Sequence, residues 1–218
     1  MPKFDRLIPL FGESGLVKLA KSTVCVVGLG GVGGDACLAL ARCGVGNLII
    51  CDFDTVEETN INRQVVANTK TIGLYKTDVL EQMIKDINPN CNVIKLTKKV
   101  DEEILDLQFD FLIDAIDDLP SKIDLIKKCL DKNIKLISSM GAAKKIDPSK
   151  VSITKLSKTA YDPVAKVLRN KLKGYDFPVV SSIETPICES LGSYMMVVNT
   201  FSLQLADYCI KYLLNKGE

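Results

Sequence analysis

The chain has 218 residues, 47% of them hydrophobic, and a formal net charge of +1. This length fits one large domain or a domain with a small appendage, and the hydrophobic fraction is sufficient for a substantial core. The absence of histidine excludes histidine acid–base catalysis. No charge-free apolar run is long enough to span a membrane, and the N-terminus lacks the apolar region of a signal peptide. We therefore expect a cytoplasmic protein without a membrane segment.

Residues 1–21 are expected to form an N-terminal arm. Leu16, Val17 and Leu19 follow the spacing of a short helix. The simplest interpretation is an arm that packs on the core and leaves Arg6 in solvent.

The next stretch has the pattern of a phosphate-binding corner. An apolar run at 24–27 predicts a strand buried on both faces, and residues 36–44 predict a helix. Between them, Gly28 permits a tight turn, Gly30 lets a phosphate approach the backbone, and Gly33 lets helix and strand pack closely. This order of elements predicts nucleotide binding. A glycine turn kept only for packing is the alternative.

A second predicted strand, 48–51, ends in Asp52, whose carboxylate is placed to accept hydrogen bonds from ribose hydroxyls. The residues after it distinguish between cofactors. A nicotinamide fold needs no Arg or Lys here, whereas the β- and γ-phosphates of ATP need fixed cations, which Arg63 and Lys76 supply. The sequence therefore favours an ATP site.

Further elements follow in alternation. Helical spacing at 79–87, a strand at 93–96 and a short helix at 102–107 precede a buried strand at 109–117 that ends in acids. Parallel sheets bind ligands at the carboxyl ends of their strands, so these acids should face the site. A strand at 135–141 should end at the same edge.

From 144 to 173 the chain is strongly basic, with nine Lys or Arg residues against two acids. Asp162 and Pro163 predict a helix start, after which Val164, Leu168 and Leu172 form an apolar face. Two interpretations stay open: a solvated surface, or a surface that contacts the phosphates of a nucleic acid. The basic residues are Lys144, Lys145, Lys150, Lys155, Lys158, Lys166, Arg169, Lys171 and Lys173, of which Lys166, Arg169 and Lys173 form a stripe at helical spacing.

Together these elements predict an α/β fold, a doubly wound, Rossmann-like and mostly parallel sheet with helices on both faces and a smaller C-terminal extension. We expect one ATP-binding domain over 1–218. Its parts are the arm at 1–21, a nucleotide-binding core at 22–143, a basic substrate-facing segment at 144–190 and a C-terminal helix at 191–218. The eight cysteines are scattered through apolar contexts and are expected to be reduced core residues.

The polar and glycine residues around the first two strands form one ordered series: Gly28, Gly30, Gly31, Gly33, Asp52, Asp54, Asn60, Arg63, Gln64 and Lys76. In order and spacing, this series resembles the ATP motifs of the ubiquitin-activating-enzyme-like adenylyltransferases. The resemblance covers nearly the whole chain. Within that superfamily, five stretches are similar to the bacterial tRNA threonylcarbamoyladenosine dehydratases: 40–46, 87–91, 114–118, 141–148 and 158–163.

The resemblance implies ATP and Mg²⁺ as cofactors, and a homodimer. It implies that the ordered series binds ATP, and that Arg6, Arg63, Lys76 and Asp117 are catalytic. Asp117 would bind magnesium, and Arg6 would reach the triphosphate of the other subunit as an arginine finger. For Asp117, the alternative is an N-cap of the helix that starts near Pro120, a role better suited to Asp118 or Ser121.

The reaction implied by the resemblance has two steps. The threonyl carboxylate of threonylcarbamoyladenosine in tRNA attacks the α-phosphorus of ATP, which gives an acyl-adenylate and pyrophosphate. A nitrogen of the same modification then displaces AMP and closes a ring, so that water is lost overall. This second step is intramolecular and needs no enzyme cysteine. The basic residues of 144–173 would contact the tRNA.

The chain departs from that branch between 174 and 190, where a long insertion is reduced to a short segment. Cys188 lies where thioester-forming relatives hold a nucleophile, but without an activating histidine we interpret it as a loop thiol.

Three rival functions stay open. The first is an adenylyltransferase that activates the C-terminus of a ubiquitin-like or sulfur-carrier protein, and such a carrier remains a possible partner. The missing Cys-x-x-Cys pairs and the basic segment argue against it. The second is a nicotinamide-dependent oxidoreductase, in which Arg63, Lys76 and Asp117 would have no common purpose. The third is a non-catalytic ATP-binding scaffold.

Overall fold

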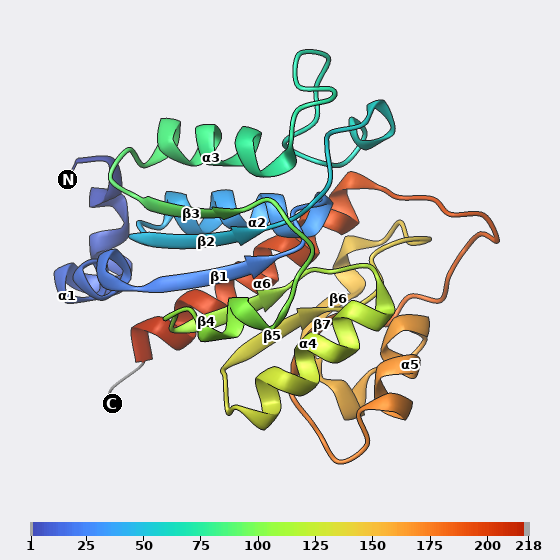
Figure 1. Cartoon of the computed structure of the whole chain (residues 1–218). Helices are drawn as coiled ribbons and strands as arrows, with labels where there is room; N and C mark the ends of the chain where they lie inside the picture. Colours follow the sequence, from blue (N-terminus) through green and yellow to red (C-terminus); the bar gives the residue numbers. More distant parts are fainter. Residues whose placement is uncertain (1, 216–218) are drawn as a thin grey trace.

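A seven-stranded sheet forms the centre of the molecule in the computed structural model, which describes residues 2–215. Its strand order is β3-β2-β1-β4-β5-β7-β6, with β6 antiparallel to β7 and every other pairing parallel. The strands are β1 Thr23–Val27, β2 Asn47–Cys51, β3 Asn92–Leu96, β4 Phe111–Asp114, β5 Leu136–Ser139, β6 Val151–Lys155 and β7 Pro178–Ser182. The predicted doubly wound, mostly parallel α/β fold is confirmed (Figure 1).

Helices cover both faces of this sheet. The α-helices are α1 Ile8–Lys21, α2 Gly31–Arg42, α3 Lys76–Ile87, α4 Leu119–Asp131, α5 Pro163–Lys171 and α6 Met195–Asn215. Short 3₁₀ helices are η1 Pro2–Leu7, η2 Glu58–Asn60, η3 Glu102–Asp106, η4 Pro148–Lys150 and η5 Leu156–Lys158. The helix predicted at 102–107 is thus a 3₁₀ helix, and the C-terminal helix begins at Met195 instead of 191.

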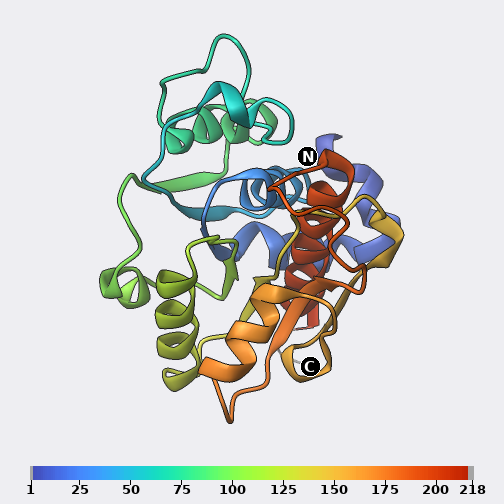
Figure 2. The same ribbon diagram turned by 90° about the vertical axis from the view of Figure 1, so that its right-hand side faces the viewer.

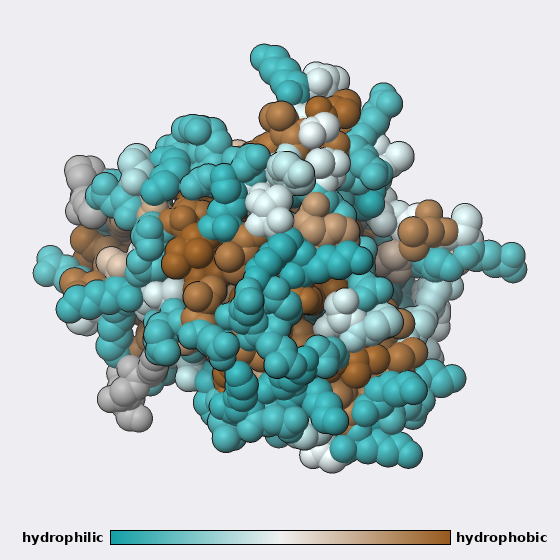
Figure 3. All heavy atoms as spheres, in the orientation of Figure 1, coloured by the Kyte–Doolittle hydropathy of each residue, from teal (hydrophilic) through white to brown (hydrophobic). Residues whose placement is uncertain are grey.

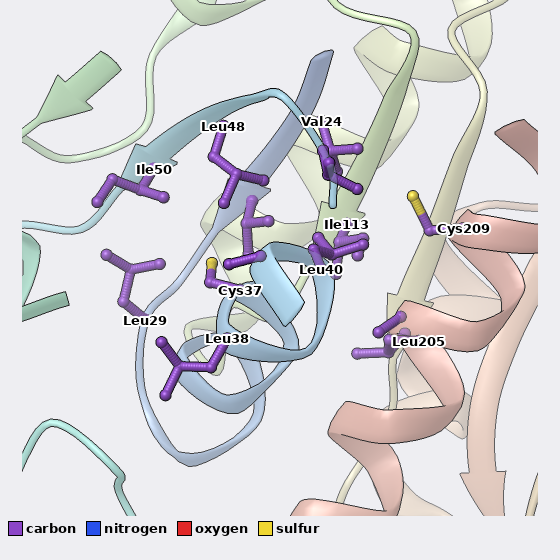
Figure 4. Close-up of a cluster of buried hydrophobic side chains, with 14 of the residues drawn as sticks. Val24, Leu29, Cys37, Leu38, Leu40, Leu48, Ile50, Ile113, Leu205 and Cys209 are labelled. Carbon is purple, nitrogen blue, oxygen red and sulfur yellow. The ribbon is translucent and has the colours of Figure 1, made fainter. Parts of the chain in front are cut away.

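Successive residues of the central strands point into two separate cores, as the period of a β-strand requires. In β1, Val24 and Val26 pack with residues of α2, α3 and α6, whereas Cys25 and Val27 pack with residues of α4 and α5. Figure 4 shows the first of these cores between the strands, α2 and α6. Burial on both faces explains why this strand is an unbroken apolar run in the sequence.

Part of the segment expected to face substrate is structural. β6 and β7 both lie within 144–190, and β7 lies between β5 and the edge strand β6, with Val179 and Val180 fully buried. The sheet therefore continues through the C-terminal third of the chain. Neither strand was predicted from the sequence, because each lies beside basic or loop residues and is defined by pairing with strands distant in the chain.

The cysteines match their prediction. All eight are free, six are buried, Cys43 is half-buried, and Cys188 is exposed. Within residues 2–215, no helix has the length and apolar character needed to cross a membrane.

Candidate functional site

A cleft of about 490 Å³ opens at the carboxyl ends of the central strands. Figure 2 looks onto this edge of the sheet. The cleft is bordered by the loops that follow β1, β2, β3, β4 and β5, and by residues near the start of α5 and α6. This is the position at which open parallel α/β sheets bind ligands. Lining residues from the ordered series are Gly28, Gly30, Gly31, Asp52, Asp54, Arg63, Gln64 and Lys76.

The glycine turn has the close backbone approaches that its sequence predicts. Gly28 has a φ of 85°, and a Cβ there would lie 2.6 Å from the carbonyl oxygen of Ala115. A Cβ on Gly33 would lie 1.8 Å from the carbonyl oxygen of Gly28. Gly33 therefore serves helix–strand packing outside the cleft, as predicted, while Gly28 and Gly30 line the cleft itself. Backbone N–H groups at the start of α2 are left to face a ligand.

Asp52 ties the glycine turn to the loop after β2. Its Oδ2 accepts a hydrogen bond from the Leu29 N–H at 2.6 Å, and its Oδ1 accepts one from the Asp54 N–H at 2.8 Å. Burial raises the pKa of this carboxyl, and the backbone donors and Lys76 oppose the rise. Each carboxylate oxygen keeps a further lone pair, so the predicted contact with a ribose stays chemically open.

Two cationic side chains, those of Lys76 and Arg63, border the cleft, and different residues hold each of them in place. The Lys76 ammonium is 2.9 Å from Asp54 Oδ2, and the Lys76 residue is only 5% exposed. Arg63 donates to the Thr59 carbonyl at 2.9 Å and to Asn62 Oδ1 at 2.8 Å. Held in this way, both side chains carry positive charge at fixed positions, which is what recognition of a polyphosphate needs.

Gln64 carries a polar group with no partner. The residue lines the cleft and is buried, and its Oε1 makes no hydrogen bond within the described part of the chain. A buried unpaired amide oxygen is costly and calls for an explanation. A ligand in the cleft would satisfy it.

Two adjacent acids after β4 have different roles. Asp118 is the N-cap of α4 and accepts hydrogen bonds from the Ser121 N–H and hydroxyl, which lower its pKa. Asp117 lines the cleft, is exposed, and makes no hydrogen bond or ion pair within residues 2–215. The strand itself ends at Asp114, three residues earlier than predicted.

Asp117 is a suitable donor for magnesium. Mg²⁺ is usually held by one or two carboxylates together with substrate phosphates, and it does not need an all-protein cage. The free carboxylate of Asp117 borders the same cleft as Lys76 and Arg63, so it would supply one protein ligand while phosphates held in the cleft supply others. In the described part of the chain, no group of three or more His, Cys, Asp or Glu side chains could hold a metal ion.

Beneath this loop lies a buried ion pair that the sequence analysis missed. Lys122 Nζ is 2.7 Å from Asp114 Oδ2 and donates to the Ile116 carbonyl at 2.9 Å, while the Ser138 hydroxyl donates to the same carboxylate at 2.5 Å. Both charged side chains are almost completely buried. The pair fixes the backbone that carries Asp117. In the sequence, the only indication of this ion pair is a lysine on the apolar face of a helix.

Besides Gly33, two predicted site residues lie away from the cleft. Asn60 is not part of its lining, since its Oδ1 accepts the Glu57 N–H at 3.1 Å and so caps η2. Arg6 is exposed in the arm, where Lys3 Nζ bonds Asn88 Oδ1 at 3.0 Å. Asn88 follows the end of α3 opposite to Lys76, about 18 Å along a helix of this length. Arg6 therefore lies near the amino ends of the strands, at the opposite end of the sheet from the cleft of its own chain.

The basic segment divides into structural and exposed residues. Lys145 is buried, lies 3.7 Å from the buried carboxylate of Asp162 and donates to the Gly141 carbonyl, so it is not available to a nucleic acid. Lys144 Nζ donates to the carbonyl of Glu189. In Figure 3, hydrophilic side chains cover much of the surface where α4 and α5 lie, with a group of hydrophobic side chains among them. The exposed members are Lys150, Lys155, Lys158, Lys166, Lys171 and Lys173.

The cleft also has residues that the sequence analysis did not propose. Lys98, Lys99 and Val100, in the loop after β3, border it, and Leu191 and Ser193 border it from the loop before α6. Lys99 Nζ lies 5.1 Å above the centre of the Phe53 ring, which is half-exposed at the same wall. Only a short polar run marks the loop after β3 in the sequence.

The fold and the cleft define a nucleotide-binding α/β protein whose glycine turn is paired with fixed cations for phosphates. The family model of the ThiF family matches residues 4–218. The chain belongs to the ThiF family.

Close relatives extend this result. The chain is 46% identical over 193 residues to tRNA threonylcarbamoyladenosine dehydratase of Bacillus subtilis, a match that covers 85% of this chain and 76% of the relative. It is 39% identical over 184 residues to the Escherichia coli enzyme of that name, covering 83% and 68%. The crystal structure of E. coli tRNA N6-threonylcarbamoyladenosine dehydratase in complex with ATP superposes with a TM-score of 0.95 at 34% identity, over 99% of this chain and 95% of that one. The resemblance stated from the motifs is confirmed.

Proposed function

We propose that this protein is an ATP-dependent tRNA threonylcarbamoyladenosine dehydratase. One observation carries the proposal: a single cleft holds the glycine turn, the fixed cations Lys76 and Arg63, and the free carboxylate Asp117. Relatives that carry this activity in their names align over more than four fifths of the chain.

In the first step, the threonyl carboxylate of the modified adenosine attacks the α-phosphorus of ATP. An acyl phosphate bond forms, the bond to the β-phosphate oxygen breaks, and pyrophosphate leaves. Lys76 and Arg63 stabilise the negative charge that develops on the phosphates, because they are held in place before the reaction starts. The N–H groups of the glycine turn orient the triphosphate.

In the second step, a nitrogen of the same modification attacks the activated carbonyl. AMP leaves with the electron pair of the acyl phosphate bond, the nitrogen loses its proton, and a hydantoin ring closes. The nucleoside thus loses one water, whose oxygen departs on AMP. Because nucleophile and electrophile belong to one group, proximity lowers the barrier without an enzyme nucleophile.

Magnesium would be held by Asp117 together with the phosphates. When bound, it would neutralise charge on the phosphates. The Asp114–Lys122 pair keeps the Asp117 loop in position for this.

Arg6 would act across a homodimer. It lies at the edge of the sheet opposite its own cleft, so any contact of Arg6 with a triphosphate would have to come from a second copy. An arginine brought in this way would add charge stabilisation on the leaving phosphates. A sulfur-carrier partner stays a prediction without further support.

Exchange of labelled pyrophosphate into ATP tests the first step by itself. We expect exchange that depends on tRNA carrying the threonylcarbamoyl modification and that is lost in Asp117→Asn. Exchange supported by a carrier protein with a free C-terminus, and not by the tRNA, would instead support the rival adenylyltransferase.

A further inference from the structure

The loop 158–162, which joins η5 to α5 and is called the rim loop here, holds an exposed aromatic residue in an unfavourable backbone conformation. Tyr161 has a φ of 57° and is 64% exposed. A residue with a Cβ is disfavoured in this left-handed region, and such residues persist where their surroundings hold them. Neither burial nor packing of its own ring accounts for a tyrosine at this position.

The rim loop is fixed from beneath on both sides of Tyr161. The carboxylate of Asp162 is completely buried and accepts hydrogen bonds from the N–H groups of Gly141 and Ala165 and from the Ser181 hydroxyl, at 3.1 to 3.3 Å. On the other side, Arg169 donates to the Thr159 carbonyl at 3.0 Å and to the Thr159 hydroxyl. The loop is therefore a rigid support, and Tyr161 needs little further ordering when it binds.

This support lies at the mouth of the cleft. Gly141, which bonds Asp162, lines the cleft, and so does Val164 in the first turn of α5. Across the cleft, the loops after β2 and β3 carry another exposed aromatic ring, that of Phe53, beneath the ammonium of Lys99. Phe53 thus lines the cleft itself, whereas Tyr161 lies in a loop whose neighbours Gly141 and Val164 line it.

The surroundings of the rim loop are positively charged. Residues 155–173 contain six Lys or Arg and one acid, and that acid is the buried Asp162. Lys158 and Lys166 are exposed on either side of Tyr161 in the sequence. Exposed rings beside Lys and Arg are the chemistry with which proteins hold unpaired nucleotides, since each base has a face that stacks and each phosphate a charge.

We propose that the rim loop binds an unpaired nucleotide of the substrate RNA, with the Tyr161 ring stacked on a base and Lys158 on an adjacent phosphate. This inference rests on the proposed function for the identity of the substrate. It adds that the enzyme recognises single-stranded loop nucleotides outside the cleft, next to the nucleotide that reacts.

The test measures binding of a fluorescently labelled RNA hairpin with an unpaired adenosine in its loop, by anisotropy, to the full chain. Tyr161→Gly removes the ring while suiting the left-handed backbone, so it preserves the fold. We expect it to weaken hairpin binding about tenfold or more, whereas Tyr161→Phe keeps full affinity. Lys158→Ala should weaken binding and lower the salt dependence by about one phosphate contact. Binding of a fully paired RNA of equal length should not change with Tyr161→Gly.

Equal hairpin affinity of Tyr161→Gly and the unchanged protein would overturn the proposal. A change in oligomeric state instead of RNA affinity would also overturn it, because the rim loop would then belong to a protein interface. The proposed function is judged separately, by ATP consumption of the unchanged protein with modified tRNA. The variants that bind RNA weakly should raise KM for tRNA and leave kcat and ATP affinity unchanged.

Discussion

Lys76 and Asp117 border the same cleft, one buried in an ion pair and the other free. Lys76→Ala removes a cation fixed by Asp54, and we expect turnover to fall by about 10²-fold or more. Asp117→Asn removes the charge that we propose binds magnesium, without changing the shape of the side chain, and should lower turnover as strongly. Circular dichroism should show an unchanged fold. Full activity of either variant would contradict the site assignment.

The buried Asp114–Lys122 ion pair is expected to contribute to the stability of the folded protein. Removing one partner of a buried pair leaves the other charge uncompensated, so Lys122→Met should lower the free energy of unfolding by about 3–5 kcal/mol. Lys122→Met combined with Asp114→Asn should recover part of this loss. Lys211→Met breaks the exposed pair with Asp207 and serves as the control, with an expected loss below about 1 kcal/mol in urea unfolding. Equal losses in the free energy of unfolding for the buried and the exposed pair would contradict a stabilising role of the Asp114–Lys122 pair.

At the scale of elements, the contact between α2 and α6 contains a pH-sensitive pair. Asn199 Nδ2 donates to Asp35 Oδ1 at 3.4 Å, while Asp35 Oδ2 and Asn199 Oδ1 have no partner in the described part of the chain. Burial raises the pKa of Asp35 from its ordinary value of 3.8 to about 6. The folded protein therefore holds this proton over a range in which the unfolded chain releases it, so this contribution to stability falls as the pH rises from 3.8 to about 6.

Asp35→Asn should stabilise the protein above a pH of about 6, because it removes the buried charge and offers an N–H to Asn199. We expect a gain of about 1 kcal/mol in the free energy of unfolding, reduced by partial solvent screening of this half-buried group. The gain in unfolding free energy should disappear well below a pH of about 6, where Asp35 is already protonated in the folded protein. Asp86→Asn, at an exposed acid on α3, is the control. A gain that does not depend on pH would contradict the assignment to Asp35.

The sequence predicted those elements whose signals are local. The run at 24–27, its glycines and the helix after them follow from burial and backbone sterics alone, and the cations Arg63 and Lys76 follow from the needs of phosphate. The strands β6 and β7 could not be found in this way, because β7 pairs with β5 and β6 pairs with β7 through contacts that are distant in the sequence. Burial of Lys145 likewise depends on Asp162, seventeen positions away in the chain. Charge counting cannot separate such a lysine from an exposed one.

At the scale of the whole molecule, the arm and the cleft lie at opposite edges of the sheet. If Arg6 acts across a homodimer, Arg6→Ala and Lys76→Ala should each be nearly inactive, and their mixture should regain activity in mixed dimers. Random exchange places one intact site in half of the dimers, so about a quarter of full activity should return. Inactivity of the mixture, with subunit exchange verified by labelled chains, would contradict action in trans.

The central claim is that ATP is spent on cyclising a modified tRNA nucleoside in this cleft. The most direct measurement is the mass of that nucleoside, after digestion of threonylcarbamoyl-modified tRNA incubated with the protein, ATP and magnesium, with AMP release followed in parallel. The proposed function predicts loss of one water from the nucleoside for each AMP released, and neither product with Lys76→Ala. An unchanged nucleoside, with or without ATP consumption, would contradict it.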